Sequence, residues 1–419
     1  MAKIKQIKSA EILDSRGSPT IETAVILTDG AVGIASCPSG TSIGSYEAVE
    51  LRDRDLNRFQ GLGVLKAIDN VQNLIAPKLI GMEASKQQEI DKTMIELDGT
   101  QNKGRLGANA MLSVSMAVSK AAAKSAVLPL FLYLRQFIKN SAVSALKIPT
   151  PLFNLINGGK HAEGSADFQE FLVIPATSKP YSEALQTGVT VYSLLKMTLK
   201  THNFSTLIGE EGGFGPKVSI NQDVFSLLRE AINASSYKLG FDIFFGLDVA
   251  ANSFYRNGQY HIKDKAMSYS SQELISYYEE LKKQFGLLYL EDPLFEDDWE
   301  GWTKICSSLK DTLIVGDDLT TTNPYRLQMA IDKKAISAII IKPNQVGTVI
   351  EALAVVEVAR ASGLKIIVSH RSGETNDDFI ADFAVAVSAD YVKFGAPARG
   401  ERVAKYNRLL LIEKQLKAL

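Results

Sequence analysis

The sequence is poor in cysteine, histidine and tryptophan, and it has no long apolar run. Its 419 residues include only Cys37 and Cys306, which excludes a disulfide scaffold and a cysteine-rich zinc site and favours a reducing, cytoplasmic location. The segment after Met1 has no apolar stretch of the secretory type, and the longest uncharged stretches are too short to span a bilayer. The net charge of -1 provides no overall field for nucleic acid or an anionic membrane.

The chain is long enough for a barrel of about 250 residues together with a smaller domain. The first 40 residues alternate apolar and polar side chains around an Asp29-Gly30 turn, which predicts a small antiparallel sheet. A helical pattern and then an alanine-rich core helix follow. Small residues and prolines mark a junction near residue 139. We therefore predict an α+β N-terminal domain over residues 1–138 and a TIM-like α/β barrel over residues 139–419.

Six apolar runs in the last 180 residues each end in a charged or polar signature. Successive signatures lie 23 to 43 residues apart, and most intervals hold an amphipathic stretch long enough for one helix. This spacing is typical of a parallel (β/α)8 barrel, in which every strand brings its C-terminal end to the same rim. The residues expected to meet at that rim are Asp248, Glu291, Asp317, Lys342, His370 with Arg371, and Lys393.

Three of these residues are acids, and three crowded carboxylates without a partner would repel one another. A hard divalent cation removes this conflict, and oxygen ligands on stiff strands suit magnesium. The alternative is that Asp248, Glu291 and Asp317 are ordinary turn-forming or helix-capping acids, which are common at strand ends. Six charged or polar strand ends that recur at similar spacing around one rim favour the metal site. The acids that directly follow two of them, Asp292 and Asp318, should point away along extended backbone and serve as turn or supporting residues.

Three glycine-rich segments are candidates for loops over the pocket. Gly40 and Gly44 bracket small hydroxyl residues, which fits either a mobile lid or a plain surface turn ahead of a helix. A second glycine loop carries His161 and precedes a strand with Glu170, and a third holds Glu210 and Glu211. Two further histidines, His202 and His261, lie in polar, unpatterned context, and we expect them at the surface.

Several motifs together resemble those of the enolase (phosphopyruvate hydratase) family, in order and over essentially the whole chain. The most specific are SHRSGET from Ser369 and IKPNQVGT from Ile341. The others are ILDSRGSPT, LDGTQNKGRLGANA, NGGKHAEGSADFQEF, GEEGGFGP, GLDVA, EDP, GDDLTTTNP and KFGAPARGERVAKYN. The resemblance implies a lyase that reversibly dehydrates 2-phosphoglycerate to phosphoenolpyruvate in glycolysis and gluconeogenesis. Its ligand is then a small phosphorylated carboxylic acid.

The resemblance also implies two Mg²⁺ ions in each active site. Asp248, Glu291 and Asp317 correspond to the ligands of a first ion that stays on the protein. Ser42 corresponds to the lid serine that closes on a second ion arriving with the substrate. Enzymes of the enolase superfamily are known to pair a Lys or His base with one or two magnesium ions.

The remaining roles follow from the resemblance position by position. Lys342 corresponds to the base at C2, with a pKa expected to fall toward the working pH through burial among cations and metal. Glu211 corresponds to the acid that protonates the departing 3-hydroxyl, with a pKa expected to rise among neighbouring acids. The catalytic set also includes Glu170. The expected substrate contacts are His161, Gln169, His370, Arg371 and Ser372, with the last two on the phosphate, and Lys393 on the carboxylate.

The chain departs from the family pattern at a few positions. Around Ser42 the lid has Thr41, Ile43 and Tyr46 in place of the usual Ala, Thr and His, and Phe394 replaces the usual Thr beside Lys393. Ala10 and Leu411 replace arginines that form ion pairs between subunits in dimeric members. A homodimer or a higher homo-oligomer remains the expectation from the resemblance, since exposed ion pairs contribute little.

Two other functions stay open from the sequence. A superfamily sibling acting on another carboxylate acid would share the metal ligands but would not need Ser42, Arg371 and Ser372 together for a phosphate. A catalytically silent paralogue, retained as a binding protein, is suggested by the altered lid alone.

Overall fold

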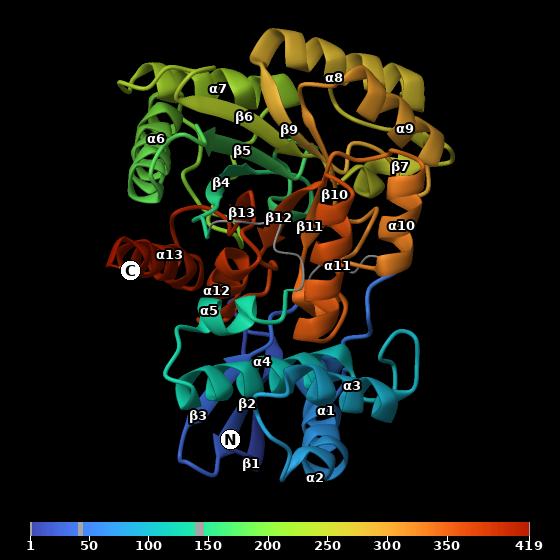
Figure 1. The fold of residues 1–419 in the computed structure, drawn as a ribbon. Coiled ribbons are helices and arrows are strands. Elements are labelled where there is room, and N and C mark those ends of the chain that lie inside the picture. Colours follow the sequence, from blue (N-terminus) through green and yellow to red (C-terminus); the bar gives the residue numbers. More distant parts are fainter. Residues whose placement is uncertain (1, 41–44, 139–145, 419) are drawn as a thin grey trace.

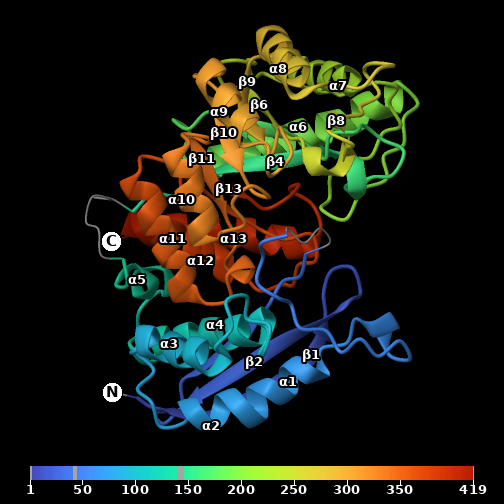
Figure 2. The ribbon, with the colours of Figure 1, turned by 90° about the vertical axis from the view of Figure 1, so that its right-hand side faces the viewer.

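The chain folds into a small N-terminal part and a barrel. A computed structural model describes residues 2–40, 45–138 and 146–418. Figures 1 and 2 show the N-terminal part packed below the barrel, with the C-terminal helix α13 (Gly400–Ala418) on the barrel. The predicted boundary at residue 138 adjoins a segment, 139–145, that lies outside the described residues.

The N-terminal part contains the predicted antiparallel sheet. Its strands are β1 (Ile4–Leu13), β2 (Pro19–Leu27) and β3 (Val32–Ser36), paired in chain order. The helices are η1 (Phe59–Gly61), α1 (Leu65–Asn70), η2 (Val71–Ile75), α2 (Ala76–Leu79), α3 (Gln87–Asp98), α4 (Ala108–Ser125) and α5 (Leu130–Arg135). The alanine-rich helix α4 is buried almost all round, as predicted, because it packs on both β2 and β3. Gly33 permits this approach, since a Cβ there would lie 2.1 Å from the carbonyl oxygen of Ala117.

The second part is a closed eight-stranded barrel, as predicted. Its strands are β4 (Thr150–Asn157), β5 (Glu170–Pro175), β6 (Ile243–Asp248), β9 (Leu287–Glu291), β10 (Leu313–Gly316), β11 (Ala338–Ile341), β12 (Lys365–Ser369) and β13 (Tyr391–Lys393). The larger helices around it are α6 (Tyr181–Thr201), α7 (Asn221–Asn233), α8 (Ser271–Phe285), α9 (Trp299–Ser308), α10 (Pro324–Asp332), α11 (Val349–Ala361), α12 (Phe379–Ala386) and α13. Short elements lie in the connections: η3 (Gly159–His161), η4 (Ala251–Phe254), η5 (Pro343–Gln345), β7 (Tyr255–Arg256) and β8 (Gln259–Tyr260). Among the helices of the described ranges, none is long and apolar enough to cross a membrane.

One strand runs against the predicted direction. β5 pairs antiparallel with both β4 and β6, whereas every other neighbouring pair in the barrel is parallel. The expectation that every strand brings its C-terminal end to one rim is therefore wrong for β5. The cause is the connection from β4 to β5, which holds only the short turn η3 and no crossover helix. As a result, Glu170 reaches the rim from the N-terminal end of its strand.

The inside of the barrel is filled by apolar side chains below the rim. Leu152, Leu172, Tyr289, Val315 and Ile340 belong to a cluster separate from the main core, and each of them has no exposed surface. Because the interior is packed, polar chemistry is confined to the rim, where the C-terminal ends of the parallel strands open onto loops.

The two parts are joined by buried and half-buried polar contacts at the starts of helices α11 and α12. Lys103 pairs with Glu351 at 2.7 Å, and Lys120 pairs with Asp377 at 2.7 Å. Asp91 of α3 accepts hydrogen bonds from the Ser115 hydroxyl, at 2.9 Å, and from the backbone N–H of Ile350 in the first turn of α11, at 3.1 Å. A carboxyl oxygen at that place accepts from a helix N–H group that has no partner within the helix.

Asp91→Asn tests the cost of burying this acid. Burial raises the pKa of Asp91 to about 7, so its carboxyl stabilises the fold fully below about pH 4, and this contribution of about 4 kcal/mol is lost as the pH rises to about 7. The free energy of unfolding in urea should therefore fall between pH 5 and pH 7.5 by about 2–3 kcal/mol more in the wild type than in the variant. The exposed Asp332→Asn is the control. Parallel pH dependences in wild type and Asp91→Asn would contradict the interpretation.

Candidate active site

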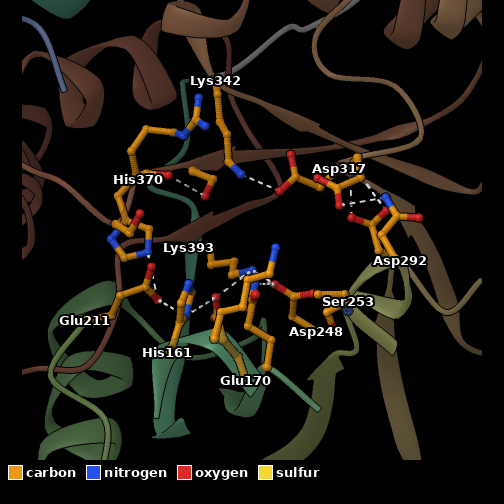
Figure 3. A pocket seen from close by; sticks show the side chains of 18 of the residues that line it. His161, Glu170, Glu211, Asp248, Ser253, Asp292, Asp317, Lys342, His370 and Lys393 are labelled. Carbon is orange, nitrogen blue, oxygen red and sulfur yellow. Dashed lines mark hydrogen bonds and ion pairs between the residues drawn. The ribbon is translucent and has the colours of Figure 1, made fainter. Parts of the chain in front are cut away.

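The predicted residues meet in one cavity at the rim of the barrel. Figure 3 shows acids on its right and lower sides, Lys342 and Lys393 between them, and Glu211 with two histidines on the left. The predicted site residues that line the cavity are His161, Gln169, Glu170, Glu211, Asp248, Asp317, Lys342, His370, Arg371, Ser372 and Lys393. Glu291 lies behind Lys393 with no exposed surface.

Strand register places the lower acids side by side. Asp248 ends β6 and is the pairing partner of Glu170 on β5 and of Glu291 on β9. The ammonium of Lys393, at the end of β13, lies 2.7 Å from Asp248, 2.9 Å from Glu291 and 3.2 Å from Glu170. Gln169 donates to Asp248 at 3.3 Å. One buried cation therefore faces three carboxylates.

The opposite side of the cavity holds a second acid–amine pair. Asp317 follows β10, Lys342 follows β11, and the Lys342 ammonium donates directly to the Asp317 carboxylate. Burial lowers the pKa of Lys342, but the charge of Asp317 outweighs it, and the net pKa is raised. The predicted lowering assumed a metal ion as well as cations next to Lys342, so it stays a prediction for the site with its ion.

Asp292 organises the turn that carries Asp317. Its two carboxylate oxygens accept from the backbone N–H groups of Asp317, at 3.0 Å, and Asp318, at 2.8 Å. The predicted turn role of Asp292 is confirmed. The prediction that Asp292 and Asp318 point away from the site is wrong, since both line the cavity. Asp292 has a φ of 42°, so the backbone there is left-handed and not extended.

The acids as a group fit a divalent cation. Burial and the neighbouring charge of Asp248 raise the pKa of Glu291 to about 8, and burial and Asp317 raise the pKa of Asp318 to about 7. Ligand oxygens of Asp248, Glu291 and Asp292 lie within 4.8 Å of one another, as do those of Asp292, Asp317 and Asp318. A bound cation would offset this concentration of negative charge, and the all-oxygen donor set is of the kind magnesium prefers.

Glu211 lies in a different environment from the other acids. Its carboxylate accepts from the side-chain amide of Asn154 at 3.1 Å and lies 3.6 Å from ring nitrogens of both His161 and His370. Burial raises the pKa of Glu211, but the histidines and Arg402 outweigh burial and hold it well below its usual range. The predicted raised pKa is wrong, because the groups nearest to the Glu211 carboxylate are Asn154, His161 and His370, not other acids. Burial and Glu211 instead help raise the pKa of Glu170, whose nearest cation is Lys393.

Arg371 is held in a fork by an acid that the sequence analysis did not single out. Its guanidinium contacts the Glu47 carboxylate at 2.9 and 3.2 Å and Asn344 at 3.1 Å. A Cβ on Gly40 would lie 2.0 Å from Nη2 of Arg371, so only glycine leaves the guanidinium this position. Ser372 follows directly and is buried. The planar donor fork points to an anionic oxygen ligand.

The departures around the lid are only partly in view. The predicted metal ligand Ser42 lies outside the described residues, as do Thr41 and Ile43. The next described departure, Tyr46, stacks its ring on Arg326 at 4.2 Å, and Arg326 is also 4.6 Å from the ring of Trp299. The substituted Tyr46 is therefore packed against the barrel by a cation–π contact.

The remaining predictions concern two histidines and the phenylalanine beside Lys393. His202 and His261 are exposed, as predicted. Phe394 is fully buried beside Lys393 and lies 6.0 Å from the ring of Tyr406, so it adds to the core and not to the cavity. Besides Glu47, the sequence analysis missed Asn154, Gln345 and Arg402. Gln345 donates to both Asp317 and Glu47 at 3.3 Å and so connects the two sides of the cavity.

A closed barrel with buried acids, two lysines and an arginine around one rim cavity defines the class of metal-dependent barrel enzymes that handle anionic substrates. Residues 4–134 match the family model described as the enolase N-terminal domain, and residues 145–419 match the enolase C-terminal TIM barrel domain. A curated relative named enolase, from Acidothermus cellulolyticus, is 49% identical over 417 residues, covering 99% of this chain and 95% of the relative. The chain belongs to the enolase family.

Asp292→Asn tests whether the turn supports metal binding. Each carboxylate oxygen of Asp292 now accepts from a different backbone N–H group, whereas an Asn side chain has only one acceptor oxygen. The turn that orients Asp317 should therefore loosen. Supporting contacts of this kind typically change metal affinity about 10- to 100-fold. Calorimetric titration with Mg²⁺ should show a loss in that range, and the exposed Asp311→Asn should show none. Equal affinities for Asp292→Asn and the wild type would refute a role for this turn.

Proposed function

We propose that the protein is a magnesium-dependent hydro-lyase that reversibly converts 2-phosphoglycerate to phosphoenolpyruvate. The observation that carries this is the arrangement of the cavity: an acid cluster faces Lys342 across a space that also holds Arg371 and Ser372. A proton acceptor, a carboxylate partner and a phosphate partner are therefore available to one small molecule. Family membership and the identity to a curated enolase support the same reaction.

Asp248, Glu291 and Asp317 would hold the first Mg²⁺, and Ser42 a second one that enters with the substrate. The ions, when bound, supply Lewis-acid stabilisation of the negative charge that develops on the substrate carboxylate. The protein side chains hold the acids in place from rigid strand ends, and Asp292 fixes the turn of Asp317.

Two side chains move the protons. Lys342 accepts the C2 proton on its amine, and the buried setting favours the neutral form once Asp317 is engaged elsewhere. Glu211 gives a proton to the departing 3-hydroxyl, which leaves as water. The negative charges of the substrate would raise the pKa of Glu211 from its present low value. Glu170, buried and with a raised pKa, lies beside this step.

The remaining residues position the substrate. Arg371 and Ser372 bind the phosphate, with His161 nearby, and Lys393 faces the carboxylate. Gln169 orients Asp248, while His370 lines the side of the cavity that holds Glu211.

The organisation of the whole protein extends this proposal. We propose domains over residues 1–138 and 139–419, a homodimer or higher homo-oligomer, and a cytoplasmic location. Both altered dimer positions, Ala10 and Leu411, are exposed and therefore available to a second subunit. The two alternatives, a superfamily sibling and a silent paralogue, are not favoured, because the phosphate residues and the proton-transfer residues are all present in one cavity.

Turnover is the direct test of the reaction. Purified protein with 2-phosphoglycerate and Mg²⁺ should produce phosphoenolpyruvate, followed by absorbance, and excess chelator should abolish the signal. Failure to turn over at saturating Mg²⁺ would exclude the proposed reaction.

Variants separate the two halves of the reaction. Glu211→Gln should still exchange the C2 proton with solvent while product formation falls about 100-fold or more, because the base remains and the acid is lost. Lys342→Ala should lose exchange and product together. Exchange of the C2 proton in deuterated buffer, measured by NMR, distinguishes them. Exchange that survives in Lys342→Ala would mean that another group is the base.

Gly40→Ala tests the position of the phosphate fork. The new Cβ would displace the guanidinium of Arg371, which is the flexible end of a side chain, so the fold should survive. The KM for 2-phosphoglycerate should rise about tenfold or more, because binding of the phosphate weakens by about 1.4 kcal/mol or more. Gly400→Ala, which has open space around the added methyl group and no left-handed backbone, is the control. An unchanged KM would place the phosphate elsewhere.

A further inference from the structure

Helix α13 inserts one arginine beneath the side of the cavity that holds Glu211. Arg402 has no exposed surface. Its guanidinium donates to the carbonyl oxygens of Arg371, at 2.6 Å, Ser372, at 2.6 Å, and Glu210, at 3.2 Å. These carbonyls belong to the two loops that carry the phosphate residues and Glu211. A single side chain therefore joins both loops from below.

The same guanidinium also contacts a histidine. Nη1 of Arg402 lies 2.7 Å from Nδ1 of His370. Arginine has only donors and stays protonated in proteins, so Nδ1 of His370 must accept this hydrogen bond. The neutral ring then carries its proton on Nε2. That nitrogen lies 3.6 Å from the Glu211 carboxylate.

Close packing restricts the position of the ring. Gly395 has a φ of 85°, and a Cβ there would lie 3.0 Å from Cε1 of His370 and 2.8 Å from the carbonyl oxygen of Glu211. The backbone of Gly395 is fixed in turn by the hydroxyl of Tyr406, which donates to its carbonyl at 2.6 Å. The ring is thus clamped between a glycine and a guanidinium.

We infer that Arg402 is a positioning residue for the acid step, because it holds His370 in the Nε2–H tautomer, so that the ring nitrogen nearest to Glu211 carries a hydrogen and cannot take the Glu211 proton. This rests on the proposed function of Glu211 as the proton donor. Once the bound substrate has raised the pKa of Glu211 and its carboxyl is protonated, the ring offers no acceptor, so that proton has one destination, the departing hydroxyl, which leaves as water. Without Arg402, Nε2 could become an acceptor and draw the Glu211 proton away.

Charge supports the geometry. The charged groups that face His370 are Glu211 from the glycine-rich turn, Arg402 from α13 and Lys393 from the end of β13. Burial, together with the two cations, lowers the pKa of His370 to about 3 against the opposing effect of Glu211. The ring is therefore neutral throughout the physiological range, as a fixed donor requires.

The first test reads the tautomer in the wild-type protein. Long-range ¹⁵N–¹H NMR distinguishes the two neutral tautomers from the charged ring, and the chain has only four histidines. Loss of a signal in His370→Gln assigns it. The expected result is a neutral Nε2–H ring from pH 6 to pH 8. An Nδ1–H ring, or a ring that titrates in this range, would overturn the inference whether or not the protein turns over 2-phosphoglycerate.

The second test uses Arg402→Met, which keeps much of the side-chain volume and removes every donor. We expect kcat to fall on the order of 100-fold with a KM within about threefold of wild type, while exchange of the C2 proton persists. The pKa of His370 should rise, because one of the two cations that lower it is gone, but burial should keep it below its ordinary value. Arg402→Lys, which keeps a donor-only cation, should recover part of kcat. Arg408→Met, on the same helix and paired with Asp382, is the control.

The outcomes separate the two claims. Equal loss of exchange and product in Arg402→Met would indicate a purely structural role and overturn the inference, as would an unchanged kcat. If Arg402→Met does not fold, the wild-type spectrum and Arg402→Lys still decide. A wild-type protein without turnover would refute the proposed function, while the tautomer measurement would stand by itself.

Discussion

The structure depends on one electrostatic constraint: more negative than positive charge is buried at the rim of the barrel. In the described part of the chain, seven carboxylates line the cavity, Glu291 lies behind it, and four lysine or arginine side chains face them. Burial makes each unpaired charge costly, and the raised pKa values of Glu170, Glu291 and Asp318 express that cost. A site of this kind is suited to binding cations.

The fold supplies the rigidity that this crowding requires. Strand register sets Glu170, Asp248 and Glu291 side by side, so their separation cannot relax by side-chain rotation alone. The reversed strand β5 contributes an acid from its first residue, which widens the set of positions that reach the rim. Residues outside the barrel strands hold the polar loops above the rim in place. Glu47 accepts a hydrogen bond from the Arg371 guanidinium, and Arg402 donates one to the backbone carbonyl of Arg371.

Much of this could be predicted from the sequence, and particular residues show why the rest could not. Asp248 and Lys342 end apolar runs, and a run followed by a charge is a local signal. The direction of β5 depends on the connection from β4, which contains no crossover helix. The absence of a helical pattern there is a weaker signal in the sequence than a charge after an apolar run. Asp292 was misplaced because a left-handed backbone angle at a non-glycine residue leaves no mark in the sequence. The pKa of Glu211 was misjudged because its neighbours come from two segments distant in the sequence, one with Asn154 and His161 and the other with His370.

The most direct test of the central claim is the position of a bound cation. A crystal of the protein with Mn²⁺ gives an anomalous signal that locates the ion independently of any assumed ligand. The account predicts a peak ligated by Asp248, Glu291 and Asp317, with the ammonium of Lys393 moved off the acids that it now contacts. A peak at the other acidic group, formed by His161, Glu170 and Glu211, or no peak at the rim, would contradict it.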